Sequence, residues 1–151
     1  MKKQAAQNSE IVTDRVIPQS LKDKIKILVV EDNRLNQKLA GFMLKEWGFK
    51  YDISANGKKA LEALKSNTYD LILMDIQMPE MNGTETAEYI RKKLKLGLPI
   101  IAMTAHAMPG EKEKCLEMGM TDFITKPINE IELYNLITNY LFSSVVKTEE
   151  I

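Results

Sequence analysis

The sequence predicts a single α/β domain of the (βα)₅ class, in which five parallel strands form one doubly wound sheet between two layers of helices. Short apolar runs alternate along the chain with segments of helical periodicity. Most of the runs are apolar at nearly every position, as is typical of parallel strands that are covered on both faces. A chain of 151 residues is long enough to bury one core of this kind.

Five segments have the length and composition of buried strands, because each is a short run rich in aliphatic or aromatic residues. The predicted strands are Ile25–Val30, Tyr51–Ser54, Leu71–Met74, Ile100–Met103 and Phe123–Ile124. Each gap between them has room for one helix. Consecutive strands are therefore expected to be parallel and to be joined by right-handed crossovers.

Two of the intervening helices carry clear apolar stripes at spacings of three and four residues. We expect the first stripe to face the sheet, with Leu35 and Leu39 on the buried side of their helix. The residues of this stripe are Leu35, Leu39, Phe42 and Met43. Those of the last helix are Leu133, Leu136, Ile137, Tyr140 and Leu141.

Three helix ends can be assigned from local signals. Asn129 followed by Glu132 has the spacing of an N-cap and its third-residue partner, and Pro127 lies just upstream. Gly48 and Gly119 suit the left-handed position that often follows a helix C-terminus.

The sequences on either side of this pattern are polar. Residues 1–24 have no sustained period and are predicted to form an N-terminal tail or linker, although the apolar pair Val16–Ile17 could dock on the domain. The domain is predicted to cover residues 25–142. Residues 143–151 are predicted to be a C-terminal tail, so the domain is expected to act through partners.

Composition excludes several classes of function. The 21 Lys and Arg residues balance 21 Asp and Glu residues, so nothing drives general attraction to nucleic acid or anionic lipid. The single cysteine, Cys115, has no partner for an internal disulfide and no His or Cys at metal-ligand spacing. No apolar run is long enough to span a bilayer, and the N-terminus lacks the apolar segment of a signal peptide. We expect a cytoplasmic protein that neither binds DNA directly nor inserts into a membrane.

Charged and hydroxyl residues stand where the predicted strands end. Glu31 and Asp32 end the first strand, Asp75 the third and Thr104 the fourth, and Lys126 follows the fifth. In doubly wound sheets, ligands bind outside these carboxyl ends. Three carboxylates brought together repel one another unless a cation shares them, and a set made only of oxygen ligands suits Mg²⁺.

The same residues have the parts needed for phosphoryl chemistry. Mg²⁺ commonly bridges carboxylates and a phosphate, and an Asp can attack phosphorus as a nucleophile. Lys126 and Thr104 can donate to phosphoryl oxygens. Each residue taken singly could instead cap a helix or remain a solvated surface charge, but the grouping of complementary residues at one sheet edge favours a functional site.

Four stretches in order carry a family resemblance. They are ILVVEDN at residues 27–33, LILMDIQMPEMNG at 71–83, IAMTA at 101–105 and FITKP at 123–127. With them the sequence resembles the receiver domains of two-component response regulators and hybrid sensor kinases over about Ile25 to Phe142. The resemblance implies a flavodoxin-like fold with strand order 2-1-3-4-5.

The resemblance also implies roles for individual residues. Asp75 is implied to be the phosphoacceptor. Glu31, Asp32 and Asp75, with the Gln77 main-chain carbonyl, are implied to hold Mg²⁺, for which Mn²⁺ is an expected substitute.

The resemblance also implies two residues that assist phosphoryl transfer and two that change conformation on phosphorylation. Thr104 and Lys126 are implied to hold the phosphoryl oxygens, and the Lys126–Pro127 bond is implied to be cis. Thr104 and Phe123 are implied to form the conformational switch. A plain core aromatic is the alternative role for Phe123.

The function implied is that of a phosphorelay signalling domain rather than an enzyme with a turnover substrate. It would promote its own phosphorylation and its own dephosphorylation. The donor is implied to be a phosphohistidine in a histidine kinase or a histidine phosphotransfer protein, and the output a change of shape read by a downstream protein. Whether the chain is a stand-alone regulator or part of a hybrid kinase, and whether phosphorylation makes a homodimer, stay open. Asn33 with Asn36-Gln37, and the run Thr104-Ala105-His106-Ala107, look more like the hybrid type.

Three other functions fit less well. Phosphatases of the haloacid dehalogenase type need a second Asp two residues after the nucleophile, where this chain has Gln77. A nucleotide-binding flavodoxin-like protein needs a Gly-rich or hydroxyl-rich phosphate loop after the first strand, where this chain has acidic residues. An interaction module that is never phosphorylated would usually have lost one of the site residues, all of which are intact.

Overall fold

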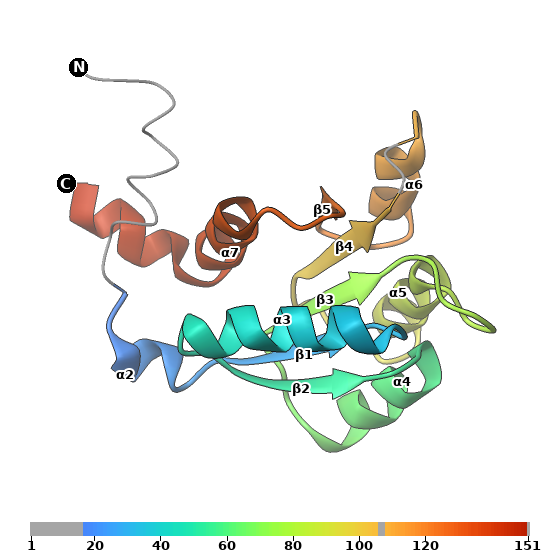
Figure 1. The fold of residues 1–151 in the computed structure, drawn as a ribbon, viewed down its shortest axis with the longest axis horizontal. Coiled ribbons are helices and arrows are strands. Elements are labelled where there is room, and N and C mark those ends of the chain that lie inside the picture. Colours follow the sequence, from blue (N-terminus) through green and yellow to red (C-terminus); the bar gives the residue numbers. More distant parts are fainter. Residues whose placement is uncertain (1–16, 106–107, 151) are drawn as a thin grey trace.

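The computed structural model describes the backbone of residues 17–105 and 108–150 and the side chains as far as Phe142. Within it, five parallel strands form one sheet in the order β2-β1-β3-β4-β5 (Figure 1). This confirms the predicted fold class and strand order. The strands are β1 Lys26–Val30, β2 Lys50–Ser54, β3 Leu71–Asp75, β4 Ile100–Thr104 and β5 Asp122–Thr125.

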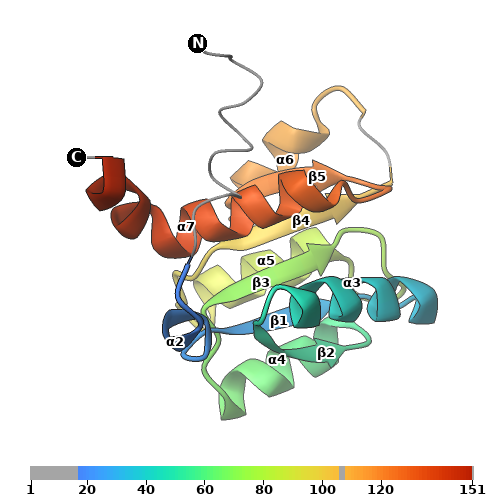
Figure 2. The same cartoon turned by 60° about the vertical axis from the view of Figure 1, so that its left-hand side comes forward.

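Helices cover both faces of the sheet, with α3 and α7 on one side and α4 and α5 on the other (Figure 2). The six helices of the described chain are α2 Gln19–Lys22, α3 Arg34–Glu46, α4 Gly57–Ser66, α5 Gly83–Lys92, α6 Glu111–Glu117 and α7 Glu130–Glu150. None of them has the length and apolar character that crossing a membrane requires.

The core consists of two apolar layers, one on each face of the sheet. In β1, Ile27 and Val29 belong to the layer beneath α3 and α7, whereas Leu28 and Val30 belong to the layer beneath α4 and α5. All four side chains are fully buried. Because successive strand residues point to opposite faces, a sheet covered twice needs apolar residues at every position, which explains the continuous runs in the sequence.

The predicted helix ends are confirmed. Gly48 and Gly119 have positive φ angles of 86° and 104°, and each ends its helix in a left-handed conformation. The Asn129 side chain accepts a hydrogen bond of 2.9 Å from the backbone N–H of Glu132 at the start of α7.

The expectation that Leu35 and Leu39 face the core is wrong. Their exposed fractions are 64% and 53%, and that of Phe42 is 63%. Met43, the last residue of the predicted stripe, is buried as expected, together with Ala40, Gly41 and Leu44. Since apolar residues at helical spacing occur on two sides of α3, periodicity alone did not identify the side that meets the sheet. The other side is an exposed apolar surface.

The predicted apolar stripe of α7 is largely confirmed. Leu133 and Ile137 are buried, and Leu136 and Leu141 pack partly buried against the core. Tyr140 lies at the edge of the stripe, is 38% exposed, and donates a hydrogen bond of 2.7 Å to the Asp122 carboxylate. The backbone of α7 leaves helical geometry at Phe142 and then continues as helix to Glu150.

Part of the predicted N-terminal tail packs on the domain. We call residues 17–22 the strap; they include α2. Ile17 is only 6% exposed and belongs to the core layer beneath α3 and α7. The Lys22 ammonium lies 5.6 Å from the ring centre of Phe49 and 5.5 Å from that of Tyr134. Residues 1–16 of the predicted tail, and His106, lie outside the described residues.

Candidate functional site

The three predicted carboxylates meet at the carboxyl ends of neighbouring strands. Glu31 and Asp32 follow β1, Asp75 ends β3, and one oxygen from each residue lies within 4.8 Å of the others. Glu31 and Asp75 are 1% and 4% exposed, whereas Asp32 is exposed. The parallel pairing of β1 with β3 brings the two strand ends together.

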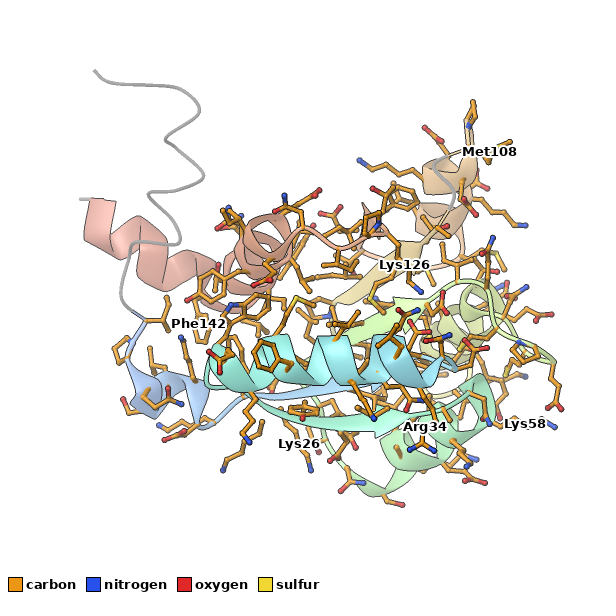
Figure 3. The ribbon with its side chains drawn as sticks, viewed as in Figure 1. Lys26, Arg34, Lys58, Met108, Lys126 and Phe142 are labelled. Carbon is orange, nitrogen blue, oxygen red and sulfur yellow. The ribbon has the colours of Figure 1, made fainter. Side chains whose placement is uncertain are left out.

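Lys126, labelled in Figure 3, follows the edge strand β5 and extends its side chain to this cluster. Its ammonium lies 3.0 Å from Oε1 of Glu31 and 3.4 Å from Oδ1 of Asp75. The backbone N–H of Lys126 donates to the carbonyl of Thr104 over 2.7 Å, and the peptide bond to Pro127 is cis, as expected. The loop after β5 is thereby fixed beside the end of β4, so that the long lysine side chain can cross to β3 and β1.

The electrostatics of the cluster favour an added cation. Burial raises the pKa of the Asp75 carboxyl to about 7, repulsion from Glu31 adds to the rise, and the charge of Lys126 opposes it. One ammonium is therefore not enough to keep Asp75 in its usual ionised range. A divalent cation shared by the three carboxylates would stabilise their charged forms, and their oxygen donors fit Mg²⁺.

The turn after β3 holds the Asp75 backbone tightly. Oδ1 of Asp75 accepts a hydrogen bond of 3.2 Å from the backbone N–H of Gln77, and the N–H of Gly83 closes the loop onto the Ile76 carbonyl over 2.8 Å. A Cβ atom at Gly83 would lie 2.3 Å from the Asp75 carbonyl oxygen. Only glycine permits this approach, and this explains the Asn-Gly pair at the start of α5.

The two predicted switch residues lie on the neighbouring strands β4 and β5. Thr104 is fully buried, and its hydroxyl donates to Oε1 of Glu111 in α6 over 3.4 Å. Phe123 is half-buried and packs against the core layer of α4, α5 and α6. Its partial exposure differs from that of a plain core aromatic.

An apolar groove of about 340 Å³ opens between α3 and α7 beside the cluster. Its walls include Leu39 and Phe42 of α3 and Ile128 of the loop before α7, and Glu31 and Lys126 lie at its polar end. The exposed apolar side of α3 thus continues into the carboxylate cluster.

One residue near the site was noted in the sequence only for its resemblance to hybrid kinases and was assigned no role. The Gln37 side chain donates a hydrogen bond of 2.7 Å to the main-chain carbonyl of Glu31. An uncharged amide in an amphipathic helix carries no chemical signal of its own, so only the structure could identify it.

Comparison with known proteins agrees with this geometry. The model of the response regulator receiver domain family matches residues 27–138. Among curated proteins, the chain is 46% identical over 140 residues to hybrid signal transduction histidine kinase I of Dictyostelium discoideum, with 87% of this chain and 8% of that protein covered. It is 42% identical over 130 residues to the signal transduction histidine-protein kinase BarA of Escherichia coli K12, with 83% and 14% covered. The chain therefore corresponds to a small part of these relatives.

Solved structures show the same fold. The receiver domain of the sensor histidine kinase PA1611 from Pseudomonas aeruginosa, which has a magnesium ion coordinated in its active site cleft, is 35% identical with a TM-score of 0.71 over 78% of this chain and 97% of that one. A chain in the co-crystal structure of the Saccharomyces cerevisiae histidine phosphotransfer protein Ypd1 and the receiver domain of its response regulator Ssk1 is 34% identical with a TM-score of 0.72, covering 78% and 88%. Fold, site and sequence agree that the chain belongs to the response regulator receiver domain family and resembles the receivers of hybrid histidine kinases.

Proposed function

We propose that the chain takes a phosphoryl group from a phosphohistidine donor onto Asp75 in a Mg²⁺-dependent reaction. The observation that carries the proposal is the buried Asp75 carboxylate, which shares a cluster with Glu31 and Asp32 and has the Lys126 ammonium 3.4 Å from Oδ1. A nucleophile, a set of hard oxygen ligands and a fixed positive charge are the groups that such a transfer requires.

In the reaction, an oxygen of Asp75 forms a bond to phosphorus while the bond from phosphorus to the imidazole nitrogen breaks. The electron pair of that bond returns to the imidazole. The attacking carboxyl must be ionised, and its pKa of about 7 without a cation means that part of the population is protonated at neutral pH. Glu31, Asp32, Asp75 and the Gln77 carbonyl would hold Mg²⁺, which supplies charge neutralisation at the carboxylates and the phosphoryl oxygens. Mn²⁺ is the expected substitute.

Lys126 and Thr104 would hold the phosphoryl oxygens once the transfer has taken place. Lys126 already contacts Asp75, and it would exchange part of its contact with Glu31 for a charge-assisted bond to the phosphoryl group. The Thr104 hydroxyl would leave Glu111 and turn toward the same group, drawing the start of the next loop inward.

Phe123 would complete the switch by moving further into the space next to β4. Phe123 is half-buried, so such a movement would remove more of its ring from water. If a Phe123→Ala variant is phosphorylated and still switches between its binding partners normally, Phe123 has no role in the switch. Slow attack by water on the acyl phosphate would reset the domain.

The exposed apolar side of α3 supports a docking surface for the donor. Leu35, Leu39 and Phe42 are more than half exposed. Leu39 and Phe42 also line the groove that ends at Glu31 and Lys126. A donor helix placed there would bring its phosphohistidine to Asp75. A histidine kinase or a histidine phosphotransfer protein has the required chemistry, and a downstream protein would read the phosphorylated form.

The proposal extends to the cellular location, the limits and the oligomeric state of the domain. We place it in the cytoplasm, since the buried free thiol of Cys115 suits a reducing compartment. The assigned limits, with a domain at 25–142 between an N-terminal segment and a C-terminal tail, remain predictions. So does a homodimer formed on phosphorylation.

Intact-mass measurement tests the proposal. The protein is incubated with a small phosphodonor and Mg²⁺, with parallel samples in Mn²⁺ and in EDTA. A metal-dependent, hydroxylamine-labile phosphoryl adduct is expected on the wild type and not on Asp75→Asn.

The matched control is Asp70→Asn. Asp70 stands at the other end of the same strand, where its carboxylate accepts from the Lys26 N–H, so this variant should keep the adduct. If neither small donors nor a panel of phosphohistidine proteins modifies the wild type, the chain is better described as an interaction module that works without phosphorylation.

A further inference from the structure

The strongest unexplained contact near the carboxylate cluster is the one made by Gln37. This residue lies in the first turns of α3, and its side-chain amide donates to the main-chain carbonyl of Glu31 over 2.7 Å. The hydrogen bond is partly buried. A side chain that reaches back from a helix to the preceding strand end fixes how the two elements are joined.

The accepting carbonyl belongs to the peptide unit between Glu31 and Asp32. Because a peptide unit is planar, fixing its carbonyl also fixes the plane from which the Asp32 main chain continues. Both residues that flank this unit contribute an oxygen to the cluster with Asp75. The Gln37 amide therefore restrains the relative orientation of two carboxylates at once.

The sheet does not hold this peptide unit by itself. The ladder between β1 and β3 ends at the pair Val30 and Met74, one residue before Glu31. On the β2 side, the N–H of Glu31 still donates to the Ser54 carbonyl over 3.0 Å, but this N–H belongs to the preceding peptide unit. Beyond that point the turn closes on itself, since the N–H of Asn33 donates to Oε2 of Glu31 over 3.1 Å and the Asn36 amide lies 3.5 Å from the same oxygen. The first helical bond, from the Gln37 N–H to the Asn33 carbonyl, holds the end of the turn, and the Gln37 side chain holds the carbonyl of Glu31 at its start.

An uncharged donor is the suitable group at this position. A lysine or arginine would bring a positive charge beside Glu31 and compete with a cation for the carboxylates. The amide fixes the carbonyl while leaving the negative charge of the cluster intact. Outer groups that orient metal ligands in this way typically change metal affinity by about 10–100-fold when removed.

We propose that Gln37 is a positioning residue of the divalent-cation site, because its amide preorganises the Glu31 and Asp32 carboxylates by holding the peptide unit between them. This inference rests on the proposed function, since it concerns the same cation site. It predicts that removing the amide weakens cation binding rather than the chemical competence of Asp75.

The experiment compares two amides that make the same kind of hydrogen bond at opposite ends of α3. Gln37→Leu removes the bond to Glu31. Gln19→Leu removes the bond of 2.8 Å from Gln19 to the Gly48 carbonyl, far from the carboxylates, and with it a bond of 2.9 Å to the Asp23 carboxylate. Calorimetric titration of the metal-free proteins with Mg²⁺ gives the affinity, and thermal melts without Mg²⁺ give the stability. Gln37→Met, which keeps the chain length, replaces Gln37→Leu if the latter does not fold.

We expect Gln37→Leu to bind Mg²⁺ about tenfold more weakly, the low end of such effects. Gln19→Leu should keep wild-type affinity, whatever stability it loses. At saturating Mg²⁺, Gln37→Leu should reach the wild-type level of Asp75 phosphorylation by a small donor, because only the cation requirement has changed.

Two results would overturn the inference: unchanged Mg²⁺ affinity in Gln37→Leu, or an equal loss of affinity in Gln19→Leu. Either result is compatible with a wild-type protein that binds Mg²⁺ and is phosphorylated, so neither would overturn the proposed function. A wild type that binds no divalent cation would instead remove the proposed function.

Discussion

Lys126 and Glu31 are 95 residues apart in the sequence and form an ion pair of 3.0 Å in which the two side chains are only 19% and 2% exposed. The pair joins the loop after β5 to the end of β1, across the two strands that lie between them. Burial makes this contact different from a surface salt bridge, because the loss of one partner leaves the other charge poorly solvated.

Replacing Lys126 should therefore destabilise the metal-free protein. We expect Lys126→Met to lose about 3 kcal/mol of unfolding free energy at neutral pH, near the lower limit for a broken buried pair. Urea denaturation measures the loss. Added Mg²⁺ should restore part of the lost stability, because the cation neutralises the negative charge of the carboxylates in place of the lysine.

The control for this variant is Lys92→Met. Lys92 pairs with Glu88 at 2.9 Å, but its side chain is 71% exposed, so we expect a loss below about 1 kcal/mol. Equal losses in the two variants would mean that the Lys126 pair has no special energetic role.

The raised pKa of Asp75 should make stability depend on pH. Because the folded state keeps a proton on this carboxyl up to a pKa of about 7, whereas the unfolded carboxyl releases it near 3.8, the folded state binds more protons between these values. The contribution of Asp75 to stability then falls as the pH rises from about 4 to 7.

Asp75→Asn removes this effect. In the absence of metal it should exceed the wild type in unfolding free energy above pH 7, by about 1–4 kcal/mol, and the difference should disappear near pH 4. Chemical denaturation at a series of pH values measures both curves. A difference that grows on acidification would contradict the raised pKa.

The exposed side of α3 should be needed for transfer from a protein donor and not for folding. We expect Phe42→Asp to reduce phosphorylation by a cognate phosphohistidine protein at least tenfold, since large apolar side chains dominate such interfaces. Stability should change by no more than about 0.5 kcal/mol, because the side chain is 63% exposed. Phosphorylation by a small donor should be unchanged.

Leu116→Asp serves as the comparison for that surface. Leu116 is 43% exposed on α6, on the other face of the sheet, and its replacement should leave transfer from the protein donor intact. Equal inhibition by both variants would show that general surface charge, rather than docking on α3, limits the reaction.

The strap should contribute to the stability of the domain. Ile17→Ala is expected to lower the unfolding free energy by about 2–4 kcal/mol, because it leaves a cavity in the core layer beneath α3 and α7. Trp47 is the single tryptophan of the chain and lies in a hollow shared with Lys22, so its fluorescence can follow unfolding. Ile131→Ala, at a residue 51% exposed, should cost less than about 0.5 kcal/mol; a similarly small loss for Ile17→Ala would show that the strap is not packed in solution.

Residues at strand ends were predictable, while contacts on helix surfaces were not. Glu31, Asp75 and Lys126 stand next to apolar runs, and a parallel sheet brings such positions to one edge whatever the packing of its helices. Whether Leu35 and Leu39 are buried or exposed depends on which of the two apolar sides of α3 meets the sheet. That choice is decided by the close fit of Gly41 against Tyr51, where an added Cβ would lie 2.8 Å from the phenol oxygen. Packing of Ile17 in the core depends likewise on distant residues and leaves no periodic signal.

The strap and the break of α7 at Phe142 lie at the same end of the molecule, beside the amino ends of the strands, whereas the carboxylates lie at the carboxyl ends (Figure 3). Phe49 connects the two features, since its ring stacks on Phe142 at 6.4 Å and lies beneath the Lys22 ammonium. Any neighbouring domain attached through these segments would thus be tethered at the pole opposite to Asp75. A phosphodonor could then reach Asp75 from the end of the molecule that carries no covalent connection.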